Sequence, residues 1–342
     1  MDIIISGFTC FPERRKHMVT VVTGATGFIG GALVEELLRR GEKVRALVRK
    51  TSNTTTLKNL NVEIAYGEML DRSSLEVALD GCDCLYHTAA LIWAADYRHL
   101  KEVNAGGTKS LLEAALKKGV KKVIYTSGGS TLCPERGGTL TEDPPQRRQY
   151  LGTYAESKWL ADQEAFKLQE RGLPLVSIHP TYVYGPSMVS GWNKSILDFI
   201  KGNLPVVPPA YLNLVFIDDV VQGHILAQEK MQAGRRYLIS GETIEVAQMM
   251  ELAAEIAGVK IKARRFPGWV VAAYAYAGET VAKVTKKRPL ITREVVRTLA
   301  SYVTVDNSRT QGELGYTPTS LRQGLEKTVR WLQQSELPVR AH

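Results

Sequence analysis

The stretch Val19-Thr-Val-Val-Thr-Gly-Ala-Thr-Gly-Phe-Ile-Gly30 decides the fold of this chain. Its first residues are apolar and β-branched, and they predict a short buried strand. A turn rich in glycine follows, and the apolar spacing after it predicts a helix from Gly30 to Arg40. A strand, a tight glycine turn and a helix N-terminus together form a site for a pyrophosphate, because free backbone N–H groups and the positive end of the helix dipole face the anion.

Each glycine of this turn has a steric reason. Gly24 permits the sharp turn, Gly27 lets a phosphate approach the backbone, and Gly30 lets the helix pack close to the strand. A strand, turn and helix without a ligand can carry the same glycines, and the spacing differs from the G-x-G-x-x-G of ordinary dinucleotide-binding folds. The motif Thr-Gly-Ala-Thr-Gly-Phe-Ile-Gly directly after a strand resembles that of the short-chain dehydrogenase/reductase superfamily. It is most similar to the extended branch, which holds NAD(P)-dependent epimerases, dehydratases and dihydroflavonol-4-reductase-like enzymes.

Composition narrows the class of protein. The chain has 342 residues, of which 44% are hydrophobic, and this suits one large domain or two closely joined ones. We find no run of about 20 apolar residues, so we expect no transmembrane helix. The most apolar late stretch, Trp269 to Ala277, is expected to be a core helix. The net charge of +9 indicates a solvated surface or attraction of an anionic cofactor. No basic run is interleaved with aromatic residues, which argues against nucleic-acid binding.

The four cysteines are Cys10, Cys82, Cys84 and Cys133, and they lack the spacing of metal ligands. We therefore expect no metal site and a reducing, cytoplasmic location. Residues 1–17 lack the features of a signal peptide, and we expect them to be a loosely held extension before a fold that begins near Met18.

Strands alternate with helices after the glycine turn. The expected strands are 43–48, 62–66, 83–88, 123–126 and 174–179, and the long helices are 100–118 and 154–169. This alternation predicts an α/β fold with a Rossmann-type, doubly wound parallel sheet and a smaller C-terminal α/β substrate domain. We assign 18–180 to the NAD(P)-binding domain, to which 214–235 returns, and 181–213 with 236–342 to the substrate domain. Within the returning part, Phe216-Ile-Asp-Asp219 is expected to open a helix capped by aspartate.

Tyr154-Ala-Glu-Ser-Lys158 is the second strong signal. Four residues apart on a helix, Tyr154 and Lys158 share one face. A phenol has a pKa of about 10, and a nearby ammonium is expected to lower the pKa of Tyr154 so that it exchanges a proton with a carbonyl or an alcohol. Chance produces Tyr-x-x-x-Lys often, but here it follows a matching glycine loop and a strand that ends in Thr-Ser.

The group that holds the substrate oxygen is less obvious. The resemblance places a serine or threonine at the position of Gly128 in Tyr125-Thr-Ser-Gly-Gly-Ser-Thr131. Ser127 and Ser130 are the two candidate substitutes. In the alternative with Ser130, a loop at Gly128 and Gly129 brings the Ser130 hydroxyl to the position where the resemblance expects the catalytic hydroxyl.

Arg49 and Lys50 follow the second strand directly. An NAD enzyme has an acidic residue there for the ribose 2′-hydroxyl, whereas arginine suits a 2′-phosphate. Arg49 and Lys50 therefore favour NADP(H) over NAD, although surface cations are common.

The resemblance implies further cofactor contacts. It implies that Glu68 and Met69 flank the adenine, that Ala89 and Ala90 pass beneath the ribose, and that the helical Asn104 braces the central strands and the lysine. The full set of expected cofactor residues is Thr23, Gly24, Thr26, Gly27, Phe28, Ile29, Gly30, Arg49, Lys50, Glu68, Met69, Ala89, Ala90, Asn104, Thr126, Lys158, Pro180 and Val183.

The substrate side lacks the polar anchors of nucleotide-sugar epimerases, since Tyr182-Val-Tyr-Gly-Pro-Ser187 replaces their Asn-Val-Tyr-Gly-Pro-Arg. The expected lining is aromatic: Trp93, Tyr97, Tyr150, Tyr182, Trp192 and Tyr211. It favours a flat or apolar carbonyl compound, although single members can be core residues. We therefore expect an NADP-dependent carbonyl reductase. The alternatives are an epimerase or dehydratase with bound NAD, and a non-catalytic NADP sensor. The resemblance leaves monomer and homodimer open.

Overall fold

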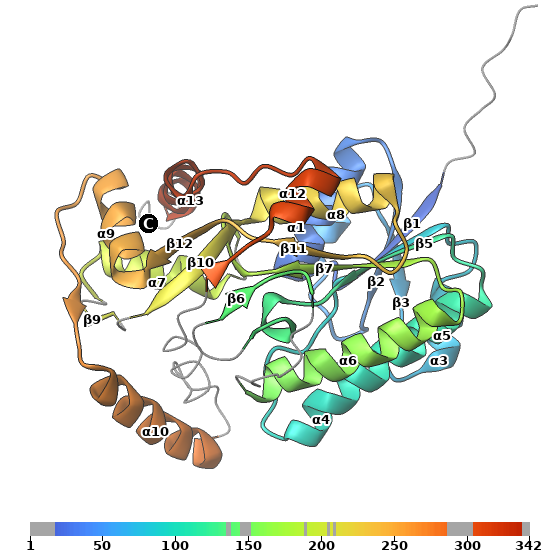
Figure 1. Cartoon of the computed structure of the whole chain (residues 1–342), viewed down its shortest axis with the longest axis horizontal. Helices are drawn as coiled ribbons and strands as arrows, with labels where there is room; N and C mark the ends of the chain where they lie inside the picture. The colour runs from blue at the N-terminus through green and yellow to red at the C-terminus, as the bar shows by residue number, and fades with distance from the viewer. Residues whose placement is uncertain are drawn as a thin grey trace, which may run out of the picture.

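The computed structural model describes residues 18–134, 138–143, 152–187, 190–203, 206–207, 210–285 and 304–336. Its centre is a seven-stranded sheet with the order β11-β7-β5-β4-β1-β2-β3, and all neighbours in it are parallel (Figure 1). The strands are β1 Val19–Thr23, β2 Lys43–Val48, β3 Glu63–Tyr66, β4 Cys84–His87, β5 Lys122–Thr126, β7 Leu175–Pro180 and β11 Arg236–Ile239. The predicted parallel α/β fold is confirmed.

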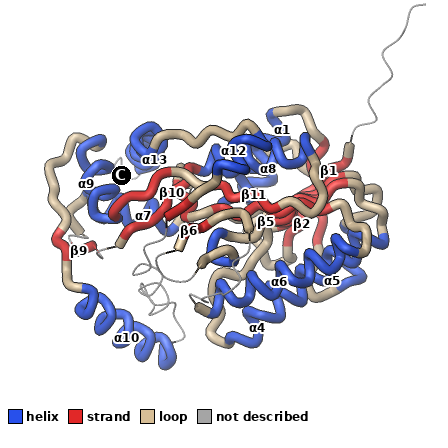
Figure 2. Tube along the Cα trace, in the orientation of Figure 1, coloured by secondary structure: helices blue, strands red, loops and turns tan. Residues whose placement is uncertain are grey.

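Helices cover both faces of this sheet, as a doubly wound fold requires (Figure 2). One layer contains α1 Phe28–Arg39 and α8 Ile217–Lys230, and the other contains α3 Arg72–Ala78, α5 Gly107–Lys117 and α6 Thr153–Glu170. The short α2, Thr55–Lys58, lies between β2 and β3 along the chain. The inner strands β1, β4, β5 and β7 are almost completely buried, as expected for a sheet covered by helices on both faces, whereas the edge strand β3 is partly exposed.

The helix predicted over 100–118 is not one regular helix. It starts earlier, as α4 Tyr97–Lys101, and a π-helical segment at Glu102–Gly106 separates α4 from α5. Apolar periodicity does not reveal a π-turn, because such a turn changes the register by one residue without ending the helix. The π-helical segment carries Asn104.

The remaining elements form smaller layers. A three-stranded sheet has the order β12-β10-β8, with β8 Tyr182–Tyr184, β10 Tyr211–Phe216 and β12 Glu242–Glu245. Its neighbours include α7 Gly191–Ile200, α9 Val246–Ile256 and α13 Leu321–Glu336 (Figure 1). The other elements are β6 Thr139–Leu140, β9 Val206–Val207, β13 Arg264–Arg265, α10 Gly268–Thr285, β14 Thr304–Val305 and α12 Ser308–Leu314. Strand β11 pairs with β7 in the large sheet. From the sequence we had expected residues 236–342, which include β11, to belong to the substrate domain.

Two local expectations are wrong. The N-cap of α8 is Phe216, and no side chain caps this helix. The aspartates tie α8 to the C-terminal segment instead, because Asp219 accepts hydrogen bonds from N–H and Oγ1 of Thr319 at 2.8 and 2.6 Å, and Asp218 pairs with Lys327 at 3.1 Å.

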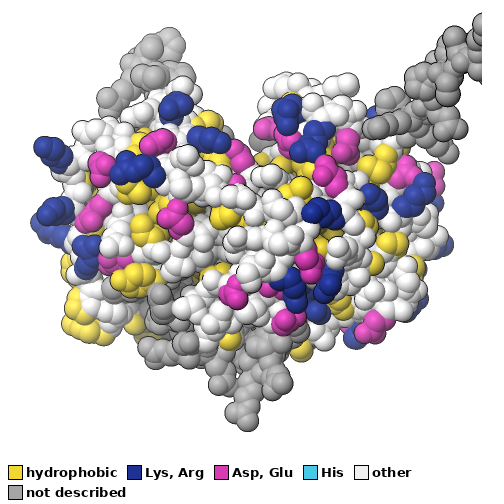
Figure 3. Space-filling view, turned by 45° about the horizontal axis from the view of Figure 1, so that its top comes forward, with side chains coloured by type: hydrophobic (Ala, Val, Ile, Leu, Met, Phe, Trp, Pro, Cys, Tyr) yellow, Lys and Arg dark blue, Asp and Glu magenta, His cyan; other side chains and the backbone are white. Residues whose placement is uncertain are grey.

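The second wrong expectation is the core helix at Trp269–Ala277. This stretch does form a helix, as part of α10, but Trp269 is 74% exposed and Tyr276 is 62% exposed. Helix α10 stands at the edge of the molecule (Figure 1). Strand β13, which pairs with β9, precedes it along the chain. None of the helices in the described ranges is both long and apolar enough to cross a membrane. On the face shown in Figure 3, cationic and anionic side chains are interspersed.

Candidate active site

The glycine loop lies at the topological switch point of the large sheet. Strand β1 is flanked by β2 on one side and by β4 on the other, so the chain continues from β1 and from β4 in opposite directions across the sheet. The first residues of the two loops are hydrogen-bonded to each other: Thr88 Oγ1 donates to the Thr23 carbonyl at 2.7 Å, and the Ala89 N–H donates to Thr23 Oγ1 at 3.2 Å. In doubly wound folds, this position is where ligands bind.

Steric contacts explain two of the glycines. Gly24 has a φ of +69°, and a Cβ added there would lie 2.8 Å from the Ala89 nitrogen. A Cβ at Gly30 would overlap the Gly24 carbonyl. Both positions therefore need glycine for the loop to pack against β4 and α1.

The N-terminus of α1 has the properties of an anion site. Its N-cap is Gly27, which is exposed and has no side chain that could satisfy the first N–H groups. The first turn contains no acidic residue, and Thr26, Phe28 and Ile29 around it are half-buried. A phosphate group fits this chemistry, because it would accept from the open N–H groups at the positive end of the helix.

Charged residues occur near the ends of the two neighbouring strands. Arg49 and Lys50 follow β2 and are exposed, and neither forms an ion pair with another residue in the described part of the chain. Glu68 follows β3 and is also exposed, while Met69 packs close to Gly107 of α5. The cations at β2 remain available to an anion.

Helix α6 carries Tyr154 and Lys158 to the end of β5. Lys158 is only 1% exposed, and its Nζ donates to the Thr126 carbonyl at 2.9 Å. The same Nζ lies 4.7 Å from the centre of the Tyr125 ring, a cation–π contact. Tyr154, one turn earlier, is half-buried. The strand end and the helix therefore fix the ammonium group from two sides.

The expected lowering of the Tyr154 pKa is wrong for this structure. Burial, assisted by the negative charge of Asp162, raises the pKa of Tyr154 to about 12. Burial also lowers the pKa of Lys158 to about 8, against an opposing effect of Asp162. Desolvation disfavours both charged forms, and a sequence motif does not reveal how much water the folded chain excludes.

Asp162 is a site residue that the sequence analysis missed. It is 5% exposed, and its Oδ1 accepts from Ser127 Oγ at 2.6 Å and from the Tyr125 hydroxyl at 3.0 Å. Its spacing from Tyr154 and Lys158 was the available signal, since residues 154, 158 and 162 fall on one helix face. Asp162 thus provides a buried negative charge behind the pair.

Three further polar residues extend this network. Ser127 Oγ lies 3.3 Å from Thr131 Oγ1, and Thr131 Oγ1 lies 3.2 Å from His179 Nδ1. His179 Nε2 in turn is 2.9 Å from Ser177 Oγ. These side chains are buried, and burial lowers the pKa of His179 to about 4, so that it remains neutral. These hydrogen bonds connect the loop after β5 to strand β7.

Ser127 and Ser130 have different environments. Ser127 is 5% exposed and points toward Asp162, whereas Ser130 is half-buried in the short 3₁₀ turn Gly129–Thr131. A Cβ built on Gly128 would lie 3.6 Å from Ser130 Oγ. The Ser130 hydroxyl therefore occupies the space beside the position where the resemblance expects a side chain.

Asn104 connects two parts of the site. Its Oδ1 accepts from the Leu91 N–H at 2.7 Å, and its Nδ2 donates to the Leu91 carbonyl at 2.9 Å and to Ser157 Oγ at 2.9 Å. It thereby links the loop after β4 to α6 next to Lys158. Ala89 and Ala90 belong to that loop.

Three other residues of the expected cofactor set have structural contacts. Thr126 is buried, and its Oγ1 lies 2.7 Å from His224 Nε2. Pro180 is buried at the end of β7, and Val183 is half-buried in β8, where it pairs with Val215. Of the aromatic residues expected near the substrate, Trp93, Tyr97, Tyr182 and Trp192 are half-buried, Tyr211 is 49% exposed, and Tyr150 lies outside the described residues.

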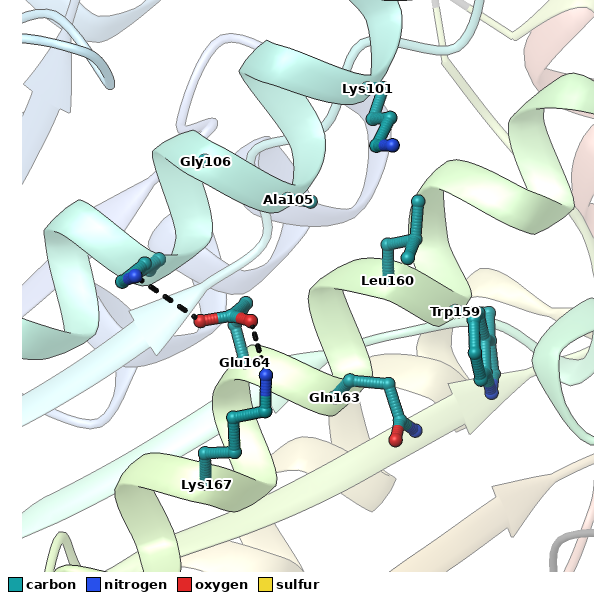
Figure 4. A pocket seen from close by; sticks show the side chains of 9 residues that line it. Lys101, Ala105, Gly106, Trp159, Leu160, Gln163, Glu164 and Lys167 are labelled. Atoms are coloured by element: carbon teal, nitrogen blue, oxygen red, sulfur yellow. Dashed lines mark hydrogen bonds and ion pairs between the residues drawn. The ribbon is translucent and has the colours of Figure 1, made fainter.

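A separate hollow lies between α6 and the helical segment that runs from α4 to α5. It has a volume of about 460 Å³, and Gly106, Trp159 and Leu160 are among its lining residues (Figure 4). Glu164 lies between Lys109 and Lys167 there, at 3.7 and 2.7 Å. Tyr154 and Lys158 do not line this hollow, so the hollow is separate from the candidate active site.

The fold, the switch-point glycine loop and the Tyr154–Lys158 pair define an extended short-chain oxidoreductase. Comparison with known proteins agrees: the model of the NAD dependent epimerase/dehydratase family matches residues 20–240. The chain belongs to this family, whose members depend on a nicotinamide cofactor.

Relatives match nearly the whole chain. Sterol demethylase protein B of Methylococcus capsulatus is 33% identical over 93% of this chain and 99% of its own. A putative dihydroflavonol 4-reductase of Synechocystis is 30% identical over 91% and 94%. The crystal structure of gox2253 is 32% identical, has a TM-score of 0.79, and is matched over 98% of its chain and 93% of this one.

Proposed function

We propose that this protein reduces a ketone or an aldehyde to an alcohol with NADPH, and that Tyr154 donates the proton. The observation that carries the proposal is the position of Lys158: its ammonium is buried at the end of β5, one helical turn from Tyr154, and is held by the Thr126 carbonyl. A buried lysine so close to a tyrosine has a strong influence on proton transfer.

The cofactor would be held by this chain in two places. The N–H groups of Phe28 and Ile29 suit the pyrophosphate, whereas the Gly27 N–H already donates to the Gly24 carbonyl at 2.8 Å. Arg49 and Lys50 suit a 2′-phosphate. When bound, the reduced nicotinamide supplies a hydride. We also propose that the other cofactor residues implied by the family resemblance contact the cofactor in this chain.

Tyr154 acts as the acid. Its pKa of about 12 keeps the phenol protonated at neutral pH, so that a proton is available when negative charge develops on the carbonyl oxygen. Lys158 donates hydrogen bonds and keeps positive charge near the phenolate that remains. A group that is protonated at rest suits the reductive direction.

Ser130 is our candidate for the hydrogen bond to the substrate oxygen. Its hydroxyl lies near the position expected for that donor, whereas the Ser127 hydroxyl is bonded to Asp162. We assign Ser127 a positioning role, in which it orients Asp162 and the loop after β5.

We propose an apolar or aromatic substrate, bound by residues 181–213 and by the segment after β11. The half-buried aromatic side chains Trp93, Tyr182 and Trp192 support this class. The names of two relatives refer to a sterol and a dihydroflavonol, which both contain fused carbon rings.

A steady-state screen tests the proposal. Oxidation of NADPH and of NADH is followed with a panel of aromatic and aliphatic ketones and aldehydes, and the alcohol is identified as the product. We expect turnover with at least one apolar carbonyl and a preference for NADPH. NAD carried through purification together with epimerisation of a sugar nucleotide would favour the epimerase instead. NADPH binding without turnover of any carbonyl would favour a sensor.

A further inference from the structure

Helix α10 exposes an apolar face. Its 18 residues, Gly268–Thr285, include one acid, Glu279, and one base, Lys283. Trp269 is 74% exposed, Tyr276 62% and Val281 59%. Large apolar side chains that gather on a surface mark an interaction site more often than single ones do.

Four exposed positions, two of them aromatic, form one stripe. Trp269, Ala272, Ala273 and Tyr276 are exposed and follow the spacing i, i+3, i+4 and i+7, which belongs to one helix face. Ala275, about a third of a turn around the helix from this stripe, is completely buried. The stripe is therefore accessible from solvent.

Exposed cations precede this helix. Lys260, Lys262 and Arg264 are exposed, and none of them forms an ion pair with another described residue. Arg265 differs, because its guanidinium lies 2.8 Å from Glu245. The sequence after the helix continues with Lys286-Lys-Arg288. Positive charge thus lies close to both ends of α10 along the sequence.

We propose that α10 lies on the surface of a bilayer that contains anionic lipids. An apolar stripe with tryptophan and tyrosine, next to lysine and arginine, is the arrangement by which interfacial helices bind such surfaces. The aromatic rings occupy the headgroup boundary, and the cations contact phosphate groups.

The helix lies on the bilayer and does not span it. None of the described helices meets the length and hydropathy that a spanning helix needs. A protein partner for the stripe would have to supply acidic groups for Lys260, Lys262 and Arg264 as well as an apolar groove. An anionic lipid surface supplies both with one chemistry.

Co-sedimentation of the full chain with vesicles tests this inference. Phosphatidylcholine vesicles in which about one lipid in three is phosphatidylglycerol are compared with pure phosphatidylcholine. We expect at least about tenfold stronger partitioning to the anionic vesicles, and a loss of this difference at about 1 M salt, where the Debye length is about 3 Å.

Two variants locate the contact. Trp269→Ser removes an exposed ring, and the triple variant Lys260→Gln, Lys262→Gln, Arg264→Gln removes the charges; we expect each to weaken partitioning at least about tenfold. The matched controls are Val77→Ser, whose side chain is 75% exposed on α3, and the triple variant Lys43→Gln, Lys58→Gln, Arg171→Gln, which removes exposed cations elsewhere. We expect both controls to bind like the wild type.

Three outcomes would overturn the proposal. They are equal binding to both kinds of vesicle, equal losses in the variants and their controls, and a dimer that Trp269→Ser dissociates in a protein that does not bind vesicles. The last outcome would identify a second copy of the chain as the occupant. None of these measurements depends on enzymatic turnover, so they are independent of the proposed reaction.

Discussion

Ser127 Oγ donates a 2.6 Å hydrogen bond to Asp162 Oδ1, and this bond points the first serine after β5 into the protein. Because Asp162 follows Lys158 by one helical turn, the bond connects the end of the strand to the helix of the proposed proton donor. The second serine, Ser130, has no such buried acceptor among the described residues. The two hydroxyls therefore have separable roles.

We predict that Ser127→Ala lowers mainly the stability of the protein and that Ser130→Ala lowers mainly kcat. Ser127→Ala removes a donor from a buried carboxylate, and we expect the free energy of unfolding to fall by about 1–3 kcal/mol. Ser130→Ala removes the proposed donor to the substrate oxygen, and we expect kcat to fall by about 10²–10³ with unchanged stability. Denaturant unfolding and steady-state kinetics on both variants check this. A kcat for Ser130→Ala equal to that of the wild type would remove Ser130 from the site.

The kcat/KM for reduction should fall as the pH rises above about 8. The pKa of Lys158 is lowered to about 8, so the ammonium loses its proton there, whereas the pKa of Tyr154 is about 12 and the phenol stays protonated. A pH–rate profile with saturating NADPH measures this. In Lys158→Arg the guanidinium stays charged, so we expect lower activity but no decrease near pH 8. A decrease that persists in Lys158→Arg would assign the titration to another group.

Asp162→Asn should move the same decrease to lower pH. The charge of Asp162 raises the pKa of Lys158 against the effect of burial, so its removal leaves desolvation unopposed. The asparagine side chain can still accept from Ser127 and Tyr125, which preserves the packing. The pH–rate profile of this variant gives the result. A shift to higher pH, or no shift, would show that Asp162 does not act on Lys158.

Arg49→Ala and Lys50→Ala should weaken NADPH binding selectively. Each loses a charge-assisted contact to a 2′-phosphate, and we expect the Kd for NADPH to rise about tenfold to a hundredfold. The Kd for NADH, which lacks that phosphate, should stay the same. Titration of cofactor fluorescence provides both constants. Equal losses for the two cofactors would show that these cations do not read the phosphate.

Local patterns predicted the sheet and the strand, glycine turn and helix at its start well. The strand at 19–23 and the strand at 43–48 are apolar runs bounded by turn residues, and their pairing in a parallel sheet follows from the helix between them. Tyr154 and Lys158 share a face of α6 because four residues make about one turn. These features depend on neighbours in the sequence.

Features that depend on distant residues were missed. Ser127 meets Asp162 across 35 positions, and Asp219 bonds to Thr319 across 100, so neither partner is visible in a local window. The raised pKa of Tyr154 results from burial, which is a property of the whole fold. Trp269 is exposed although its stretch is apolar, since hydropathy does not show what the helix faces.

The central claim is that Tyr154 supplies the proton in an NADPH-dependent reduction. The most direct test is Tyr154→Phe, measured for kcat with the best carbonyl of the panel and for the Kd of NADPH. The variant keeps the ring and removes the hydroxyl, so we predict that kcat falls at least about a thousandfold, within the range of a lost general acid, and that the Kd changes less than about twofold. Turnover at the wild-type rate in Tyr154→Phe would contradict the account.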